Sequence, residues 1–179
     1  MAETGGKAIS LYFAHVVAEK LRPLVAPGTR VLDFGDRRGR VALHLEASGI
    51  TVARGPEPEE GAERPHAFAG AYAEIHDWPV ARTGAQGLAE RLQAGAPVLV
   101  RLERRAEQSV AGVTRDCGPD FFWRNATSLG LLVPPEDQSS WAERHPHAFA
   151  ALCALEGLVR SWPGFRHAGR EALLLGVRR

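Results

Sequence analysis

The stretch Arg30–Gly39 constrains the fold more than any other part of the sequence. Its apolar residues Val31, Leu32 and Phe34 predict a short buried strand. The glycines at positions 35 and 39 then mark a tight turn, and a helical pattern begins directly after it. The first N–H groups of a helix have no partner within the helix, so a strand that turns directly into a helix predicts a site for a nucleotide-like ligand.

The amino-acid composition is that of one folded domain over residues 1–179. The chain is 45% hydrophobic and 24% charged, which is ordinary for a protein with a core and excludes a disordered chain. Its formal net charge of +1 gives no electrostatic reason to expect nucleic acid or a membrane as a partner. No apolar run approaches the ~20 residues of a membrane helix and no export signal is evident, so we expect a cytoplasmic protein.

The hydrophobic pattern predicts helices and strands in alternation. Four segments repeat apolar residues every three or four positions and are expected to be helical: 8–24, 41–47, 84–94 and 146–161. Four segments have the apolar content of strands: 30–34, 50–53, 67–75 and 97–102. Because strands and helices alternate, we expect a mainly parallel sheet with right-handed connections.

The last part of the chain carries three further expectations. Two closely spaced strands, Phe165–His167 and Glu171–Arg178, predict an antiparallel hairpin at the edge of the sheet. Residues 106–143 include the aromatic cluster Phe121–Trp123, which is either part of a lid over a ligand or packing over a sheet edge. The helix from Pro146 carries one apolar stripe of the kind that packs on a core: Ala148, Leu152, Leu155, Val159 and Trp162.

This order of elements resembles the class I S-adenosylmethionine-dependent methyltransferases over most of the chain. In that family the first strand ends in the pattern Asp-x-Gly-x-Gly-x-Gly, onto which Asp33, Gly35 and Gly39 fall. The segment Ala73–Pro79 looks like the end of the family's fourth strand, and Leu88–Val100 like the helix and fifth strand after it. The resemblance implies an α/β, Rossmann-like methyltransferase fold with a mainly parallel sheet and a C-terminal antiparallel hairpin.

The resemblance also implies S-adenosylmethionine as the cofactor and assigns residues to it. The methionine end would lie against four residues of the first turn: Asp33, Gly35, Asp36 and Gly39. Glu57 is the candidate ligand of the ribose hydroxyls.

His76 and Asp77 lie in the segment that resembles the end of the fourth strand, and open α/β sheets bind ligands where their strands end. We expect Asp77 to contact the cofactor. His76 is the candidate general base for an acceptor hydroxyl, because its unperturbed pKa lies near neutrality; the alternative is a loop histidine beside a packed Trp78.

Three departures from the family pattern concern the cofactor site. Arg37 stands where the middle glycine allows close approach of the backbone to the cofactor. Gly55 stands at the end of the second strand, where the family has its acidic ribose ligand. Too few residues lie between the second strand and His76 for the usual helix and third strand, so we expect the third strand to be missing.

These features leave two hypotheses of different classes. The first is an enzyme that transfers a methyl group from S-adenosylmethionine to an oxygen or nitrogen of a small-molecule substrate. The second is an inactive methyltransferase fold that serves as a binding or regulatory module for an unidentified protein partner. No metal is expected, since His145 and His147 lack acidic or cysteine partners and Cys117 and Cys153 match no metal spacing.

Overall fold

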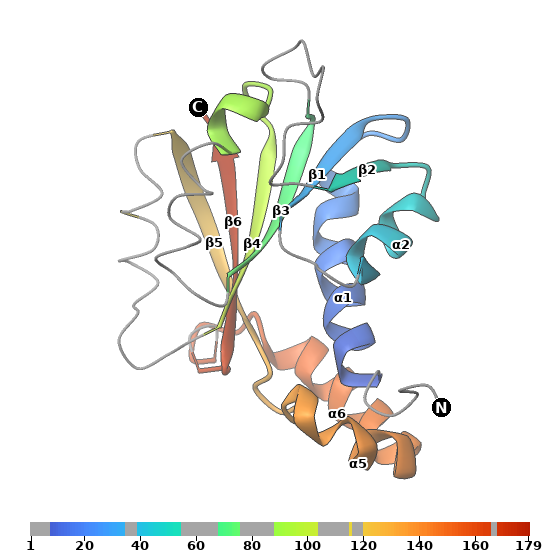
Figure 1. Ribbon diagram of the computed structural model, residues 1–179. Coiled ribbons are helices and arrows are strands. Elements are labelled where there is room, and N and C mark those ends of the chain that lie inside the picture. Colours follow the sequence, from blue (N-terminus) through green and yellow to red (C-terminus); the bar gives the residue numbers. More distant parts are fainter. Residues whose placement is uncertain are drawn as a thin grey trace.

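One twisted sheet organises the fold of the computed structural model (Figure 1). The described residues are 8–34, 39–54, 68–75, 88–103, 115, 120–165 and 168–179. The strands are β1 (Arg30–Phe34), β2 (Thr51–Arg54), β3 (Gly70–Ile75), β4 (Pro97–Glu103), β5 (Phe121–Leu129) and β6 (Glu171–Arg178). They form a six-stranded sheet in the order β2-β1-β3-β4-β6-β5.

The sheet is mainly parallel, as the alternation of elements predicts. β1 pairs in parallel with β2 and β3, and β3 pairs in parallel with β4. β6 runs antiparallel between β4 and β5. The predicted combination of a parallel sheet and an antiparallel C-terminal pair is therefore confirmed. Among the described residues, no further strand pairs with the outer edge of β2.

The described helices lie close to their predicted places. They are α1 (Ala8–Leu21) with its 3-10 extension η1 (Arg22–Leu24), α2 (Arg40–Glu46), η2 (Glu136–Gln138), α5 (Ser139–Arg144) and α6 (Pro146–Val159). Residues 88–91 are also helical, within the predicted segment 84–94. Among the described residues, no helix is both long enough and apolar enough to cross a membrane.

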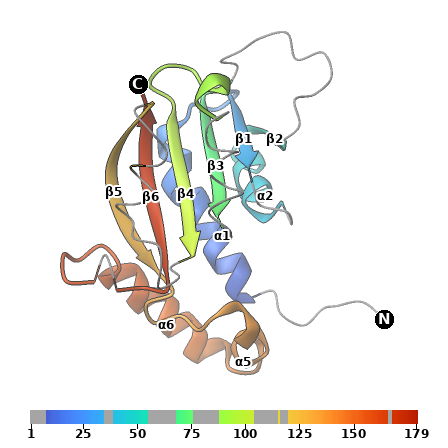
Figure 2. The same ribbon diagram turned by 60° about the vertical axis from the view of Figure 1, so that its left-hand side comes forward.

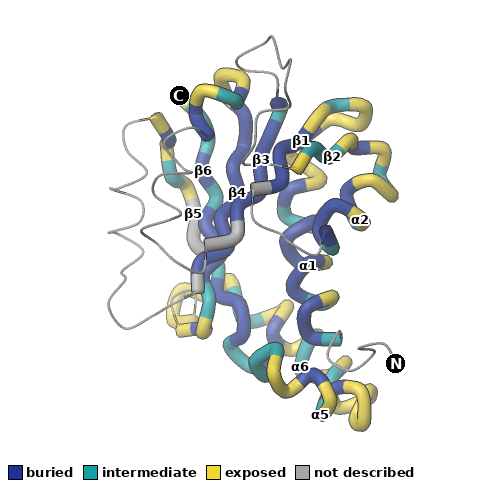
Figure 3. Tube along the Cα trace, in the orientation of Figure 1, coloured by how far each residue is buried: buried dark blue, intermediate teal, exposed yellow. Residues whose placement is uncertain are grey.

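Alternation along the strands divides the core between the two faces of the sheet. In β4, Leu99 packs on the side of α1 and α2, whereas Val98 and Val100 pack on the opposite side, where Leu88 and Leu92 lie. Successive side chains of a strand point to opposite faces, so a strand buried on both faces is apolar at nearly every position. Figure 3 shows this as an almost uninterrupted buried centre.

One prediction for the end of the chain is wrong in detail, the position of the second strand of the antiparallel pair. The antiparallel partner at the edge of the sheet is β5, not a strand at Phe165–His167: Phe165 lies in a turn, and the two residues after it are outside the described residues. The aromatic cluster Phe121–Trp123 accordingly begins the edge strand itself. Both hydrogen-bonding edges of β6 are occupied, by β4 and β5, so no place is left for the predicted partner.

The predicted core stripe of α6 is right for Leu152, which packs on the core, and wrong for most of its other members. Ala148, Leu155 and Trp162 are exposed, and the helix instead buries the carboxylate of Glu156. The inward side carries partly buried apolar side chains: Phe149, Leu152 and Cys153. Glu156 determines this orientation because its carboxylate accepts hydrogen bonds from three backbone N–H groups, those of Gly130, Leu132 and Val133, at 2.9–3.0 Å.

Candidate functional site

The candidate site lies at the carboxyl ends of the parallel strands. Figure 2 shows the arrowheads of β1 and β4 pointing toward the end of the molecule where α5 and α6 lie. Open α/β sheets bind ligands outside this edge, because loops and helix starts converge there.

Asp33 lies at this edge, next to the last residue of β1. It is 3% exposed and stands in register with Arg54 of β2 on one side and Tyr72 of β3 on the other. Val31, two residues earlier in β1, packs on the side of α1 and α2, so Asp33 points to that side as well. A buried carboxylate at the end of the first strand can accept N–H or O–H groups of a ligand.

Gly39 begins the helix that follows β1. Its backbone has φ +62° and ψ 26°, the left-handed conformation that favours glycine. Its carbonyl accepts the first hydrogen bond of α2, from the N–H of Leu43 at 3.2 Å. Because glycine has no side chain, the start of α2 presents bare backbone at position 39.

Arg54 covers this bare backbone. It is the last residue of β2, and a Cβ atom built on Gly39 would overlap its guanidinium group. The strand register places Arg54 beside Asp33, so the cation and the carboxylate end neighbouring strands. Arg54 is exposed, so its side chain has room to move.

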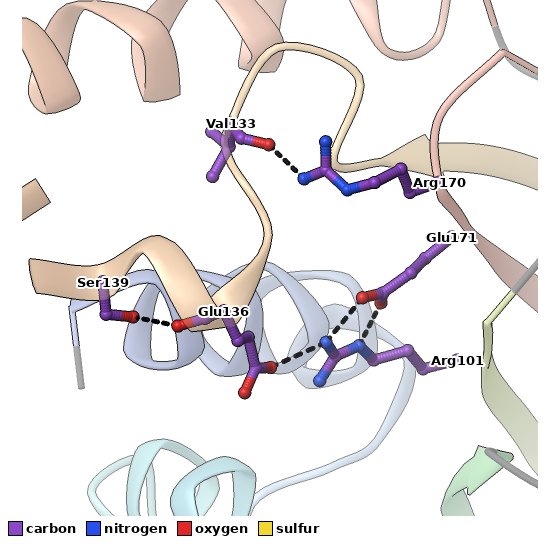
Figure 4. A network of polar contacts seen from close by, with 6 residues as sticks. All are labelled: Arg101, Val133, Glu136, Ser139, Arg170 and Glu171. Carbon is purple, nitrogen blue, oxygen red and sulfur yellow. Dashed lines mark hydrogen bonds and ion pairs between the residues drawn. The ribbon is translucent and has the colours of Figure 1, made fainter. Parts of the chain in front are cut away.

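A second polar cluster lies at the same edge, on β4 (Figure 4). The buried guanidinium of Arg101 hydrogen-bonds both carboxylate oxygens of Glu171 on β6, with Nη2 to Oε1 at 2.9 Å, and donates to Glu136 on η2 at 2.9 Å. It also lies over the ring of Phe13, 4.8 Å from the centroid. The cluster fixes η2, and with it the start of α5, to the carboxyl edge of the sheet.

The structure brings together two of the predicted site residues. Asp33 and Gly39 both lie at the carboxyl edge, on the two sides of the turn that joins β1 to α2. The other predicted residues are outside the described residues: Gly35, Asp36, Glu57, His76 and Asp77. The same holds for Arg37 and Gly55, on which two departures from the family pattern rest.

Arg54 and Arg101 were not among the site residues predicted from the sequence. The sequence does contain a signal for Arg101, because it is a charged residue inside the apolar run 97–102. A charged residue in a buried strand is expected only where it has a partner. Arg54 is the last residue of its strand, where a charged residue gives no sign of a functional site. Among the described residues, no group of three or more His, Cys, Asp and Glu side chains is placed to hold a metal ion, and His145 and His147 are exposed.

Comparisons with known proteins give a fold. Neither the protein-family models nor the curated proteins contain a match. Solved structures, in contrast, do match the chain. The chain is similar to the [4+2]-cyclase SpnF, with TM-score 0.60 and 16% identity over 98% of this chain and 84% of that one. It is also similar to a putative methyltransferase of Haloferax volcanii in complex with the Trm112 activator, with TM-score 0.58 and 14% identity over 96% and 91% of the two chains.

A third similar structure contains a ligand. It is the 1,6-didemethyltoxoflavin-N1-methyltransferase of Burkholderia thailandensis with bound S-adenosylhomocysteine, with TM-score 0.56 and 15% identity over 97% of this chain and 80% of that one. The chain has the methyltransferase fold. At these identities the likeness concerns the architecture, and the strand order with its antiparallel β6 belongs to that architecture.

Proposed function

We propose that the chain binds S-adenosylmethionine at the carboxyl edge of β1 and transfers its methyl group to an oxygen or nitrogen of a small molecule. The observation that carries the proposal is the combination of a buried carboxylate, Asp33, near the end of β1 with a left-handed glycine, Gly39, at the start of α2. The sequence pattern at this turn and the structures with the same fold support it.

The residues at the turn fit the methionine end of the cofactor. Gly39 has no side chain to keep a ligand from the backbone, and the carboxylate of Asp33 is an acceptor for an ammonium group. Once bound, the cofactor would supply a methyl group on a positively charged sulfur. The chain's own part is to hold the acceptor in line with that sulfur, while His76 is the candidate base for the proton that the acceptor releases.

A second function is favoured by one observation, the position of Arg54. Its guanidinium fills the space over Gly39 and brings a positive charge next to a ligand that is itself positive. If Arg54 stays in this position, the fold acts as a binding or regulatory module for a protein partner and does not take up the cofactor. The cyclase among the similar structures illustrates that this fold serves other functions as well.

Calorimetric titration with S-adenosylmethionine and S-adenosylhomocysteine tests the proposal. We expect a sub-millimolar dissociation constant for the wild type and at least ~10-fold weaker binding for Asp33→Asn, which keeps the size of the side chain but removes its charge. Asp120→Asn is the matched control, because Asp120 is exposed and precedes β5 at the opposite edge of the sheet. No heat from either ligand at millimolar concentration would overturn the proposal.

The variant Arg54→Ala separates the two functions. If the wild type binds the cofactor, removing a movable cation should strengthen binding by up to ~10-fold. If only Arg54→Ala binds, the guanidinium closes the site and the second function is favoured. Arg22→Ala controls for the change in net charge, since Arg22 is exposed and follows α1 in η1.

A further inference from the structure

The outer side of α6 is apolar and uncharged. Leu155 and Leu158 are 48% and 69% exposed, and in the turn that follows the helix Trp162 and Phe165 are 54% and 41% exposed. The rings of these two aromatic residues lie 6.2 Å apart. Figure 3 shows exposed residues along much of this helix. We call these four side chains the α6 patch.

The lack of charge on this side follows from the way α6 is held. Glu156 is the only charged residue between Pro146 and Val159, and its carboxylate is turned inward onto the backbone of residues 130–133. Apart from His147 in the first turn, the remaining exposed positions of the helix after Pro146 are small: Ala148, Ala150, Ala151, Ala154 and Gly157. On α1, by contrast, the exposed side carries His15 and Glu19, as is usual for a helix that faces water.

We infer that the α6 patch binds a second copy of this chain, with the two α6 helices antiparallel across a two-fold axis near Leu158. The inference does not depend on the proposed function. An axis near Leu158 brings the aromatic residues that follow one helix, Trp162 and Phe165, toward the alanine-rich part of the partner's α6 on the other side of the axis. The large end of each face thus meets the small end of the other, which makes the surface complementary to itself.

The area of the patch suits such a dimer. Its four side chains together expose about 400 Å² if a large apolar side chain presents about 200 Å² in full. An interface of standard size covers about 800 Å² on each partner, and somewhat more than half of that area is apolar. The patch and the surrounding alanines therefore supply the apolar part of one such interface.

The charge distribution favours a second copy over a different partner. A two-fold contact brings each residue near the axis against its own equivalent, so any charge there would meet a like charge. A surface that selects a different partner carries charges for its complement. The α6 patch contains none.

Sedimentation equilibrium of the full chain tests the inference. We expect a dimer at micromolar concentration, and at least ~100-fold weaker association for Leu158→Glu, because each dimer loses two buried leucines and brings two carboxylates together. The matched control is Leu43→Glu on α2, where Leu43 is 64% exposed outside the patch. Both residues are exposed, so circular dichroism should report the same fold for both variants.

A cross-link tests the position of the axis. Under mild oxidation Leu158→Cys should give a disulfide-linked dimer that neither the wild type nor Leu43→Cys gives. A wild type that stays monomeric at 100 µM, or a dimer that persists unchanged in Leu158→Glu, would overturn the inference. A monomer that instead co-sediments with phosphatidylcholine vesicles would overturn it as well and assign the patch to a lipid surface.

Discussion

The guanidinium of Arg54 lies against Gly39 at the point where β1 turns into α2. The two residues meet because β1 and β2 are neighbouring parallel strands, so the end of β2 comes to lie beside the turn that leaves β1. Position 39 therefore requires glycine for two separate reasons. One is its left-handed backbone, and the other is the space that Arg54 occupies.

Substitution by alanine separates these reasons. Gly39→Ala should lower the free energy of unfolding by about 1–2 kcal/mol for the left-handed backbone, and by more where the new Cβ displaces Arg54. Gly49→Ala is the matched control: its φ is +76° and nothing lies within 4 Å of an added Cβ, so only the backbone cost remains. Urea unfolding measures both losses.

A double-mutant cycle then isolates the contact. In an Arg54→Ala background the loss caused by Gly39→Ala should shrink to that of Gly49→Ala, because the space over position 39 is now empty. An equal loss with and without the arginine would contradict the position of the guanidinium.

Arg101 should not tolerate lysine. A lysine offers a point charge in place of the fork that hydrogen-bonds both oxygens of Glu171 while donating to Glu136. We expect Arg101→Lys to lower the free energy of unfolding by about 1–2 kcal/mol and Arg101→Ala by about 3–5 kcal/mol, since alanine leaves the mostly buried Glu171 carboxylate without its cation. Arg144→Lys, at an exposed site on α5, should change it by less than about 0.5 kcal/mol, and a similar value for Arg101→Lys would show that the fork contributes nothing.

The sequence predicts the local units of this fold and the turn between them. Val31 indicates a strand, Asp33 a carboxylate near its end and Gly39 a turn. Each of these signals can be read from the sequence because it depends on only a few neighbouring residues. The position of Arg54 over the turn depends on the pairing of β1 with β2, which local patterns do not contain. The pairing of β6 with β5 was missed for the same reason: the two strands are separated by η2, α5 and α6.

The orientation of α6 was missed for a different reason. Hydrophobic periodicity assumes that the whole apolar stripe of a helix is buried, and here Leu155 and Trp162 of that stripe are exposed while Glu156 is buried. Burying Glu156 satisfies three backbone N–H groups at once, including that of Val133, and an unpaired buried N–H costs about 1–3 kcal/mol. Hydrophobic periodicity does not take the hydrogen bonding of buried backbone N–H groups into account.

Glu156 should therefore be sensitive even to glutamine. The amide of Glu156→Gln has one acceptor oxygen where the carboxylate has two, and its NH2 group would face a backbone N–H. We expect a loss of about 2–4 kcal/mol in the free energy of unfolding, measured by urea denaturation. The control is Glu46→Gln on α2, which is exposed and should change stability by less than about 0.5 kcal/mol; equal effects of the two substitutions would contradict the role of the carboxylate.

Cys153, on the inward side of α6, should be a slow nucleophile. Burial raises the pKa of its thiol from 9.0 to about 11, and the nearby Glu156 carboxylate acts in the same direction. The thiolate is the reactive form, so at pH 8 the folded chain should react with iodoacetamide about a hundredfold more slowly than the unfolded chain. Mass spectrometry in a Cys117→Ser background measures this rate, and a native rate profile that levels off near pH 9 would contradict the shift.

The same shift predicts how stability depends on pH. Because the folded pKa lies above the unfolded one, the neutral thiol contributes stability that is fully present below pH about 9 and is lost as the pH rises to about 11. Burial also raises the pKa of Tyr12 above its ordinary value, so the wild type loses further stability above pH 10. Cys153→Ala removes only the first contribution, and urea unfolding from pH 8 to 11 should therefore show a shallower fall for this variant than for the wild type.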